Sequence, residues 1–189
     1  MNPIYFETIK CDDFSVYNLD FHKKRISDTV GLNINLEEYI YPPSNTLLKC
    51  KVTYDTSGIL GVEYAPYQKK NIKTFKLVFD DYVAYRHKSV AREIIDKLVL
   101  KKGECDEIII IKNGFVTDTS IANIAIYYKE QWFTPKRPLL LGTTRARYIQ
   151  NNQLIESDIT PTILKEATKI GLLNAMIDFD IISNFQIKE

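Results

Sequence analysis

Residues 142–145 read Gly-Thr-Thr-Arg, and they separate a run of three leucines from a stretch that looks helical. If a helix starts at Thr143, its first backbone N–H groups have no partner inside the helix, and the aligned peptide dipoles add partial positive charge there. A phosphate at that position accepts several N–H bonds, and a threonine hydroxyl adds another. The alternative is an ordinary turn in which Thr143 or Thr144 simply caps the helix.

The common short motifs for nucleotide binding, zinc catalysis and serine-nucleophile chemistry are missing from the sequence. It contains no G-x-x-x-x-G-K-[ST], G-x-G-x-x-G, H-E-x-x-H or G-x-S-x-G. The only histidines are His22 and His87, and neither has a cysteine beside it. Because a zinc site needs three or four ligands, we expect no metal site.

The composition is typical of a soluble protein. A length of 189 residues with 45% hydrophobic residues suits one domain, or two small lobes that share a core. The net charge of +1 does not indicate nucleic acid or an anionic membrane surface as a partner. Cys11, Cys50 and Cys105 are odd in number and far apart, which favours a reducing compartment. With no secretory signal and no apolar run that could span a bilayer, we expect a cytoplasmic protein.

The order of the expected elements indicates an α+β fold with a strand-rich first lobe at 1–80 and a second lobe at 81–189. Helices are expected at 20–30, between Asp20 and Gly31, at 89–103, between Ser89 and Gly103, and at 143–150 and 161–171. Strands are expected at 4–10, 14–17, 106–111, 115–118, 121–128, 131–135 and 172–181, and runs at 46–55, 58–67 and 74–81 suggest an antiparallel meander. An Asn-Gly pair at 113–114 predicts a hairpin turn.

Seven short fragments occur in the order typical of one enzyme family. They are FETIK at 6–10, FHKKR at 21–25, HKSVAR at 87–92, NGFVTDTSIANIAI at 113–126, WFTP at 132–135, LLLGTTR at 139–145 and NAM at 174–176. Together they make the chain resemble the class IV aminotransferases, the fold type IV pyridoxal-phosphate enzymes. This family includes branched-chain and D-amino acid aminotransferases and aminodeoxychorismate lyase. The resemblance implies a two-lobed fold, here trimmed at the N-terminus because the chain opens almost directly at FET.

The resemblance assigns the cofactor's aldehyde and its ring nitrogen to two residues. Lys88 matches the lysine that binds the aldehyde covalently. It would lie at the start of the helix expected at 89–103, whose positive field would lower the pKa of the amine. Asp118 matches the acid that keeps the ring nitrogen protonated, although the family places a glutamate there. The alternatives are a solvated lysine and a turn residue at the end of a strand.

The cofactor's phosphate is assigned to four further positions. Thr143 and Thr144 match the backbone donors, Arg25 matches an arginine of the first helix, and Asn174 matches a polar residue before the last strands. The alternatives are an exposed helix charge for Arg25 and a capping or turn residue for Asn174.

Four other polar residues lie in or near these motifs. The two histidines are taken as structural, and Asn123 is expected to bond backbone beside the cofactor. Arg92 follows Lys88 by one helical turn in the expected helix. It would keep Lys88 neutral, bind a substrate carboxylate, or pair with a neighbouring Glu93 or Asp96.

Two reactions fit the resemblance. A lyase would release pyruvate from 4-amino-4-deoxychorismate and leave 4-aminobenzoate for folate synthesis, whereas an aminotransferase would move the amino group to a keto acid. The arginine of HKSVAR and the NAM fragment favour the lyase over a branched-chain or D-amino acid aminotransferase. A non-catalytic cofactor-binding homologue is the remaining alternative. The family also implies a homodimer acting on a small amino substrate.

Overall fold

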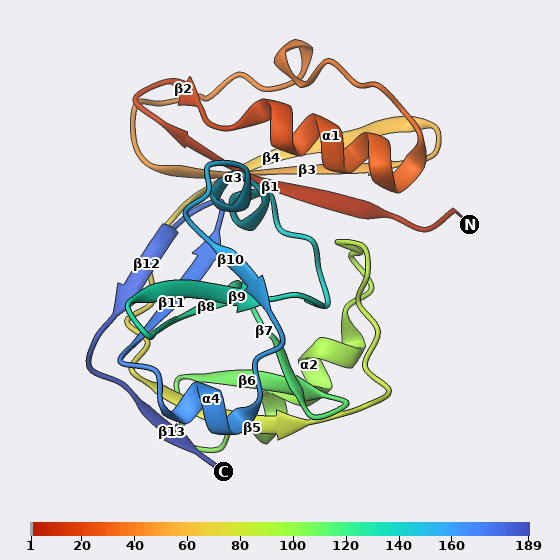
Figure 1. The fold of residues 1–189 in the computed structure, drawn as a ribbon. Coiled ribbons are helices and arrows are strands. Elements are labelled where there is room, and N and C mark those ends of the chain that lie inside the picture. Colours follow the sequence, from red (N-terminus) through yellow and green to blue (C-terminus); the bar gives the residue numbers. More distant parts are fainter. Residues whose placement is uncertain (1) are drawn as a thin grey trace. The chain divides into compact units, whose positions relative to one another are not determined.

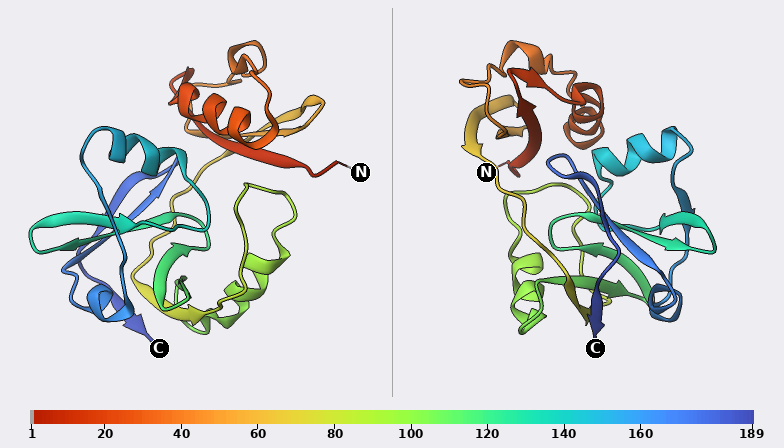
Figure 2. Two further views of the ribbon diagram at one scale, coloured as in Figure 1. Left: turned by 45° about the vertical axis from the view of Figure 1, so that its right-hand side comes forward. Right: turned by 90° about the vertical axis from the view of Figure 1, so that its left-hand side faces the viewer.

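The computed structural model describes residues 2–189, which form two compact units (Figures 1 and 2). The first unit runs to Lys69 and also includes His87–Ala91, and the second comprises Lys70–Arg86 and Arg92–Glu189. This division differs from the expected lobes at 1–80 and 81–189. Within the described chain, no helix is long and apolar enough to cross a membrane.

The first unit is an antiparallel sheet of four strands with one helix and one 3-10 turn. The strands follow the order β2-β1-β3-β4. Their bounds are β1 Tyr5–Asp12, β2 Ser15–Val16, β3 Leu48–Asp55 and β4 Gly58–Pro66, and the helical elements are α1 Leu19–Val30 and η1 Leu36–Glu38. Alternate residues of β1 and β3 are buried, as in a sheet with one covered face. Ile26 of α1 packs into this core with Ile9 and Val52.

Helix α1 ends as predicted and begins slightly earlier. Gly31 has φ 76°, a left-handed conformation that suits glycine, and its N–H donates to Ser27 O. The residue that caps the N-terminus is Asn18, so Asp20 lies inside the first turn rather than before it. An acidic residue in that turn still suits the positive end of the helix dipole.

Residues 87–91 are not helical, so the helix predicted from Ser89 is wrong in its first turn. The Phe6 N–H donates to Lys88 O (2.9 Å), and Tyr5 and Ser89 form an isolated bridge. This pairing with β1 fixes backbone that a helix would need, and α2 begins only at Glu93. Ser89 Oγ accepts from the Ala91 N–H (3.1 Å), which is a local turn and not a helix cap.

The second unit is built on a mixed sheet of nine strands. Its main path is β10-β9-β8-β7-β6-β5-β13, and β11 pairs with both β8 and β12. The bounds are β5 Thr74–Phe79, β6 Glu107–Lys112, β7 Phe115–Thr119, β8 Asn123–Tyr128, β9 Gln131–Pro135, β10 Ile155–Ser157, β11 Lys169–Asn174, β12 Asp178–Ile182 and β13 Gln186–Lys188. Strand β5 pairs in parallel with β6 and β13, so the antiparallel meander holds for β3 and β4 but not for residues 74–81.

Helices cover both faces of β6, and this explains its uninterrupted apolar sequence. Ile108 and Ile110 pack with Leu98 of α2 (Glu93–Val99), which continues into η2 (Leu100–Lys102). Ile109 and Ile111 face the other way, into the core that contains Leu164 of α4 (Pro161–Lys165). The two helices can be followed from two directions in Figure 2.

Helix α4 is shorter than predicted. Thr160 caps it by accepting from the Ile163 N–H, and Pro161 begins it. The helix expected to reach 171 instead gives way to β11, because the buried run from Ile170 to Leu173 pairs with both β8 and β12. Two-sided pairing of this run outweighs its local helical pattern.

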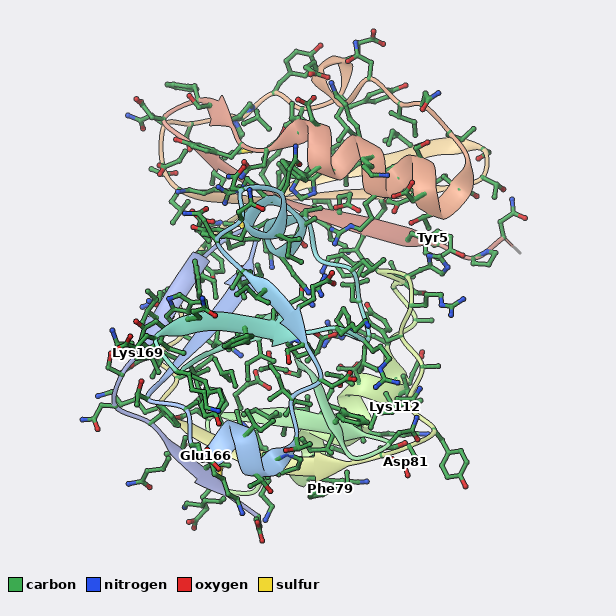
Figure 3. The ribbon with its side chains drawn as sticks, in the orientation of Figure 1. Tyr5, Phe79, Asp81, Lys112, Glu166 and Lys169 are labelled. Carbon is green, nitrogen blue, oxygen red and sulfur yellow. The ribbon has the colours of Figure 1, made fainter. Side chains whose placement is uncertain are left out.

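The predicted hairpin joins β6 and β7. Asn113 and Gly114 have φ 50° and 78°, the two positive values that a tight hairpin turn needs. The carboxylate of Asp81 accepts from the Asn113 N–H (2.6 Å), which holds the loop after β5 to this turn. Asp81 and Lys112, the last residue of β6, are labelled in Figure 3.

Candidate active site

Helix α3 (Thr143–Gln150) starts where the Gly-Thr-Thr pattern predicted. Gly142 occupies the capping position in an extended conformation, so neither threonine is the N-cap residue. The Ala146 N–H makes the first intrahelical bond, to Gly142 O (2.9 Å). The N–H groups of Thr143 and Thr144 therefore belong to the orphan donors of the first turn, as an anion site requires.

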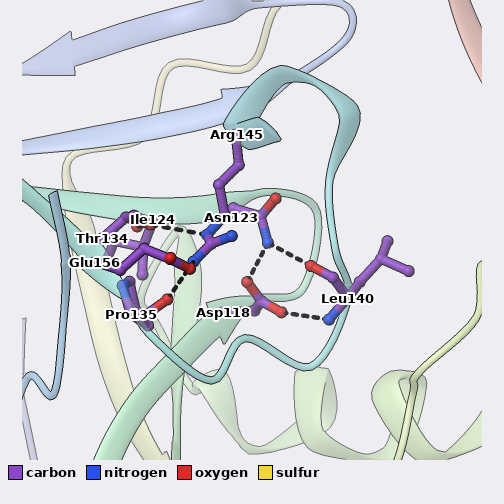
Figure 4. A network of polar contacts seen from close by, with 8 residues as sticks. All are labelled: Asp118, Asn123, Ile124, Thr134, Pro135, Leu140, Arg145 and Glu156. Atoms are coloured by element: carbon purple, nitrogen blue, oxygen red, sulfur yellow. Dashed lines mark hydrogen bonds and ion pairs between the residues drawn. The ribbon is translucent and has the colours of Figure 1, made fainter. Parts of the chain in front are cut away.

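Asp118 and Asn123 are register partners at the single point where β7 pairs with β8. The Asn123 amide donates to Asp118 Oδ1 (2.6 Å) and to Leu140 O (2.8 Å). Asp118 Oδ2 accepts from the N–H groups of Leu139 (2.7 Å) and Leu140 (2.9 Å). One carboxylate and one amide thus fasten the turn before α3 to the ends of two strands (Figure 4).

The pKa of Asp118 is raised to about 7. Burial is the largest cause, and it outweighs the lowering by hydrogen bonds from Leu140, Asn123 and Leu139 and by the charge of Arg145. A carboxyl group in this state is close to balance between its two forms at neutral pH. A cationic partner placed against it would shift that balance to the carboxylate.

Arg145 anchors the first turn of α3, and the sequence did not identify it as a site residue. Its side chain is buried, and its guanidinium donates to Pro135 O (2.7 Å), Glu156 Oε1 (2.6 Å) and Thr134 Oγ1 (3.3 Å) (Figure 4). These bonds tie α3 to β9 and β10. The signal available in the sequence was a fixed charge one residue after the two threonines.

Asn174 lies at the end of β11 and has the turn-forming role that was the alternative for it. Its Oδ1 accepts from the N–H groups of Met176 (2.9 Å) and Ile177 (3.1 Å). Its amide also donates to Ile121 O (3.2 Å), in the turn that links Asp118 to Asn123. Asn174 therefore supports the turn that follows Asp118, while its contact with a phosphate stays a prediction.

Arg25 of the first unit is part of a buried charge cluster and is not an exposed helix charge. Its Nε donates to Glu7 Oε1 (2.8 Å), and one terminal nitrogen donates to Glu7 Oε2. His22 Nδ1 lies 2.6 Å from Glu7 Oε2. Burial would raise the pKa of Glu7, but the charge of Arg25 and the bonds from His22 and Arg25 lower it to about 2.

Glu7 is a second residue that the sequence did not single out. It lies on the buried face of β1 with Ile9 and Cys11, and it is fully buried. A charged residue at an inward position of an alternating strand was the available signal, because such a group needs a buried partner. The partner could not be named before the helix was placed.

Lys88 lies in the segment that bonds to β1, five residues before α2 begins, so the field of a helix N-terminus does not act on it as predicted. Its Nζ is 4.6 Å from the centre of the Phe6 ring. Arg92 bonds to Asp96 (3.0 Å), one of its expected partners, and to Ser120 O (3.2 Å). This places Arg92 beside the turn that follows Asp118.

The residues present fit pyridoxal phosphate, whose ring nitrogen needs a carboxylate and whose phosphate needs N–H donors. The second unit contains both the carboxylate, at Asp118, and the N–H donors, at Thr143 and Thr144. Hydrogen bonds of Asn123 connect Asp118 to the turn that leads into α3. Asp118 accepts one bond at Oδ1, from Asn123, and two at Oδ2, from Leu139 and Leu140, and a carboxylate offers roughly four acceptor positions. The first unit carries Lys88 and Arg25.

Comparison with known proteins gives one consistent result. The family model described as amino-transferase class IV matches residues 62–184. An uncharacterized protein of Haemophilus influenzae is 34% identical over 187 residues, which cover 93% of this chain and 98% of that protein. The structure of a proposed 4-amino-4-deoxychorismate lyase from Haemophilus somnus 129PT is similar with TM-score 0.80 and 31% identity, covering 93% of this chain and 97% of that one.

A more distant solved structure has the same fold. It is a hypothetical aminotransferase from Mycobacterium tuberculosis in its PLP-bound form, with TM-score 0.77 and 13% identity, covering 97% of this chain and 81% of that one. At this level of identity the similarity is one of architecture. The fold type IV architecture expected from the sequence is therefore confirmed over nearly the whole chain.

Proposed function

We propose a lyase activity for this chain, which belongs to the class IV aminotransferase family. The reaction is the release of pyruvate from 4-amino-4-deoxychorismate with formation of 4-aminobenzoate. Pyridoxal phosphate is the proposed cofactor. The observation that carries the choice of reaction is the similarity to the Haemophilus somnus protein, which extends over almost the full length of both chains.

The roles proposed for the second unit follow from its geometry. Asp118 would accept the ring N–H at Oδ1, and the positive ring would hold its carboxyl group ionised. The N–H groups of Thr143 and Thr144 would bind the phosphate oxygens at the start of α3. Arg145 holds that turn in place through its bonds to Pro135 O and Glu156 Oε1.

The roles proposed for the first unit concern covalent attachment and proton transfer. When bound, pyridoxal phosphate supplies an aldehyde that joins an amine and a ring that accommodates negative charge. Lys88 would hold the aldehyde until the substrate amine takes its place, and the freed Lys88 amine would take the proton from the substrate carbon that bears the amino group. The bond between the substrate's own ring and its enolpyruvyl oxygen would then break, and the leaving group would gain a proton and become pyruvate. Arg25 would add positive charge for the phosphate while Glu7 orients it.

The direct test is an assay of the purified protein loaded with pyridoxal phosphate. Pyruvate and 4-aminobenzoate should appear in equal amounts from 4-amino-4-deoxychorismate, without any keto-acid acceptor. Borohydride should fix a pyridoxyl group on Lys88, and Lys88→Ala should lose both the adduct and the turnover. A colourless protein with no adduct would reject the cofactor and, with it, the lyase.

The same protein should also be tested with glutamate, branched-chain amino acids or D-alanine together with keto acids. Amino-group transfer without pyruvate release from aminodeoxychorismate would replace the lyase by an aminotransferase. Binding of the cofactor without either activity would indicate a non-catalytic homologue. A homodimeric state and a cytoplasmic location remain proposals, which sedimentation and cell fractionation can check.

A further inference from the structure

Asn123 has contacts with three separate parts of the candidate site. Its amide bridges Asp118 Oδ1 (2.6 Å) and Leu140 O (2.8 Å), so both of its N–H bonds are used. Its Oδ1 lies against Gly142, where an added Cβ would come within 1.9 Å of it. One buried side chain therefore touches the acid, the turn and the residue that caps α3 (Figure 4).

The nitrogen of pyridoxal phosphate is part of its pyridine ring, and the phosphate is carried on a substituent at another position of the same ring. A protein that binds both ends must hold its acid and its phosphate donors at a fixed separation, and any looseness costs affinity. In this chain the acid is an aspartate, which is shorter than the glutamate expected from the family resemblance. Its reach toward the ring therefore depends more strongly on where the turn at 139–142 lies.

We propose that Asn123 is a positioning residue that sets the separation between the Asp118 carboxylate and the N–H donors at the start of α3, so that both engage one pyridoxal phosphate. This inference rests on the proposed function. It goes beyond the expectation from the sequence, in which Asn123 only bonded backbone. Asn123 itself makes no contact with the cofactor in this scheme.

The turn between Asp118 and Asn123 has bonds that do not involve the Asn123 side chain. Glu107 accepts from the Ser120 N–H (3.2 Å), and Arg92 donates to Ser120 O (3.2 Å). The turn between Asp118 and Asn123 is therefore held independently of the Asn123 amide. Removing that amide should loosen the turn at 139–142, which keeps the N–H bonds of Leu139 and Leu140 to Asp118, without melting the turn at 119–122.

The test compares ligands that bind at one end with a ligand that binds at both ends. Pyridoxine 5′-phosphate carries the ring nitrogen and the phosphate but no aldehyde, so Lys88 cannot trap it covalently. Inorganic phosphate and pyridoxine each carry one end. Dissociation constants for the three ligands are measured by calorimetry or ³¹P NMR on the wild type and on Asn123→Leu, with thermal melting of each protein in parallel.

For Asn123→Leu we expect the affinity for pyridoxine 5′-phosphate to fall about tenfold, because a ligand whose two ends no longer match both sites loses about one hydrogen bond to a charged group. The affinities for inorganic phosphate and for pyridoxine should each change less than about twofold, since neither ligand needs the separation to be correct. Equal losses for all three ligands, or no loss for pyridoxine 5′-phosphate, would overturn the inference.

A second variant covers the case in which Asn123→Leu does not fold. Gly142→Ala keeps every donor and acceptor but pushes the Asn123 amide away from its place, and it should give the same selective loss. Thr117→Val is the matched control, because Thr117 is the buried neighbour of Asp118 on β7 and its hydroxyl donates to Ile110 O (3.0 Å). The control should lose stability but keep all three affinities.

The two proposals fail in different ways. If the wild type forms no borohydride-stable adduct on Lys88 and binds neither phosphate ligand, the proposed function and this inference both fall. If the wild type forms the adduct but Asn123→Leu and Gly142→Ala bind pyridoxine 5′-phosphate as tightly as the wild type, only the positioning role of Asn123 falls.

Discussion

The guanidinium of Arg25 donates to both oxygens of Glu7, a carboxylate with 0% exposed surface on the covered face of β1. The Arg25 side chain is itself only 14% exposed. Two ions removed from water in this way depend on each other, because either one alone would be left as a poorly solvated charge. The pair therefore fixes the orientation of α1 on β1 as well as the direction of the arginine.

Replacing Glu7 with glutamine should strongly destabilise the first unit. The amide keeps the shape but not the charge, so Arg25 loses its counter-ion, and the free energy of unfolding should fall by about 3–5 kcal/mol in urea denaturation. Glu63→Gln is the control in the same sheet. Its partner Lys51 is 3.9 Å away and Glu63 is 74% exposed, so a change within about 0.5 kcal/mol is expected. A similarly small loss for Glu7→Gln would show that the buried pair contributes little.

The advantage of Glu7 over glutamine should also depend on pH. The pKa of Glu7 is lowered in the folded chain from 4.5 to about 2, so its stabilising contribution is complete above pH 4.5 and is lost as the pH falls through 2. The difference in unfolding free energy between the wild type and Glu7→Gln should therefore shrink on acidification through this window. A difference that stays constant from pH 6 down to about 2 would contradict the lowered pKa.

The ionisation of Asp118 should affect stability in the opposite direction to that of Glu7. Its folded pKa is raised from 3.8 to about 7, so the protonated form favours folding, and this contribution is lost as the pH rises through 7. Without cofactor, the melting temperature of the wild type should fall relative to that of Asp118→Asn by roughly 5 °C as the pH is raised from 4 to 8.

Pyridoxal phosphate supplies the experimental check on that prediction. Its charged ring nitrogen would pair with the carboxylate, so the melting temperature of loaded wild type should depend less on pH than that of the unloaded protein. Asp118→Asn should bind the cofactor but turn over substrate at least about tenfold more slowly. An unchanged rate would remove the role assigned to the acid.

Local signals in the sequence identified the elements whose structure is decided locally. The Asn-Gly turn, Gly31 after α1 and the Gly-Thr-Thr start of α3 all appear where they were predicted. Each depends on backbone conformation or capping within a few residues. The fold type was recognisable because seven short fragments, each contained within a few residues, occur in the order typical of one family.

Features decided by distant pairing were not predictable in this way. Residues 88–90 carry a helical pattern, but their backbone bonds to the first strand and is not helical. Strand β5 reads like its antiparallel predecessors, yet it pairs in parallel with β6. The buried partners of Glu7 and Arg145 likewise come from other elements, so only the need for a partner was visible in the sequence.

Replacing Arg145 with methionine should loosen the first turn of α3. The change removes charged hydrogen bonds to Pro135 O and Thr134, while Glu156 is 46% exposed and can remain hydrated. A loss of about 2 kcal/mol in unfolding free energy is expected. The pKa of Asp118 should also rise further, since the charge of Arg145 lowers it. Arg137→Met removes a 65%-exposed arginine paired with Asp158 and should leave both measurements almost unchanged.

Gly171 should tolerate no side chain, because β11 passes directly under an aromatic ring. A Cβ added at this position would lie 2.0 Å from Cε2 of Phe179, its diagonal neighbour on β12, and the ring is held by edge contacts with Trp132 (4.7 Å) and Tyr148 (5.0 Å). Gly171→Ala should therefore cost about 1–3 kcal/mol in unfolding free energy. Adding Phe179→Leu makes room for the methyl group, so the double variant should lose less than the sum of the two single variants. Strict additivity of the two losses would show that the ring moves aside freely and that the close approach does not constrain β11.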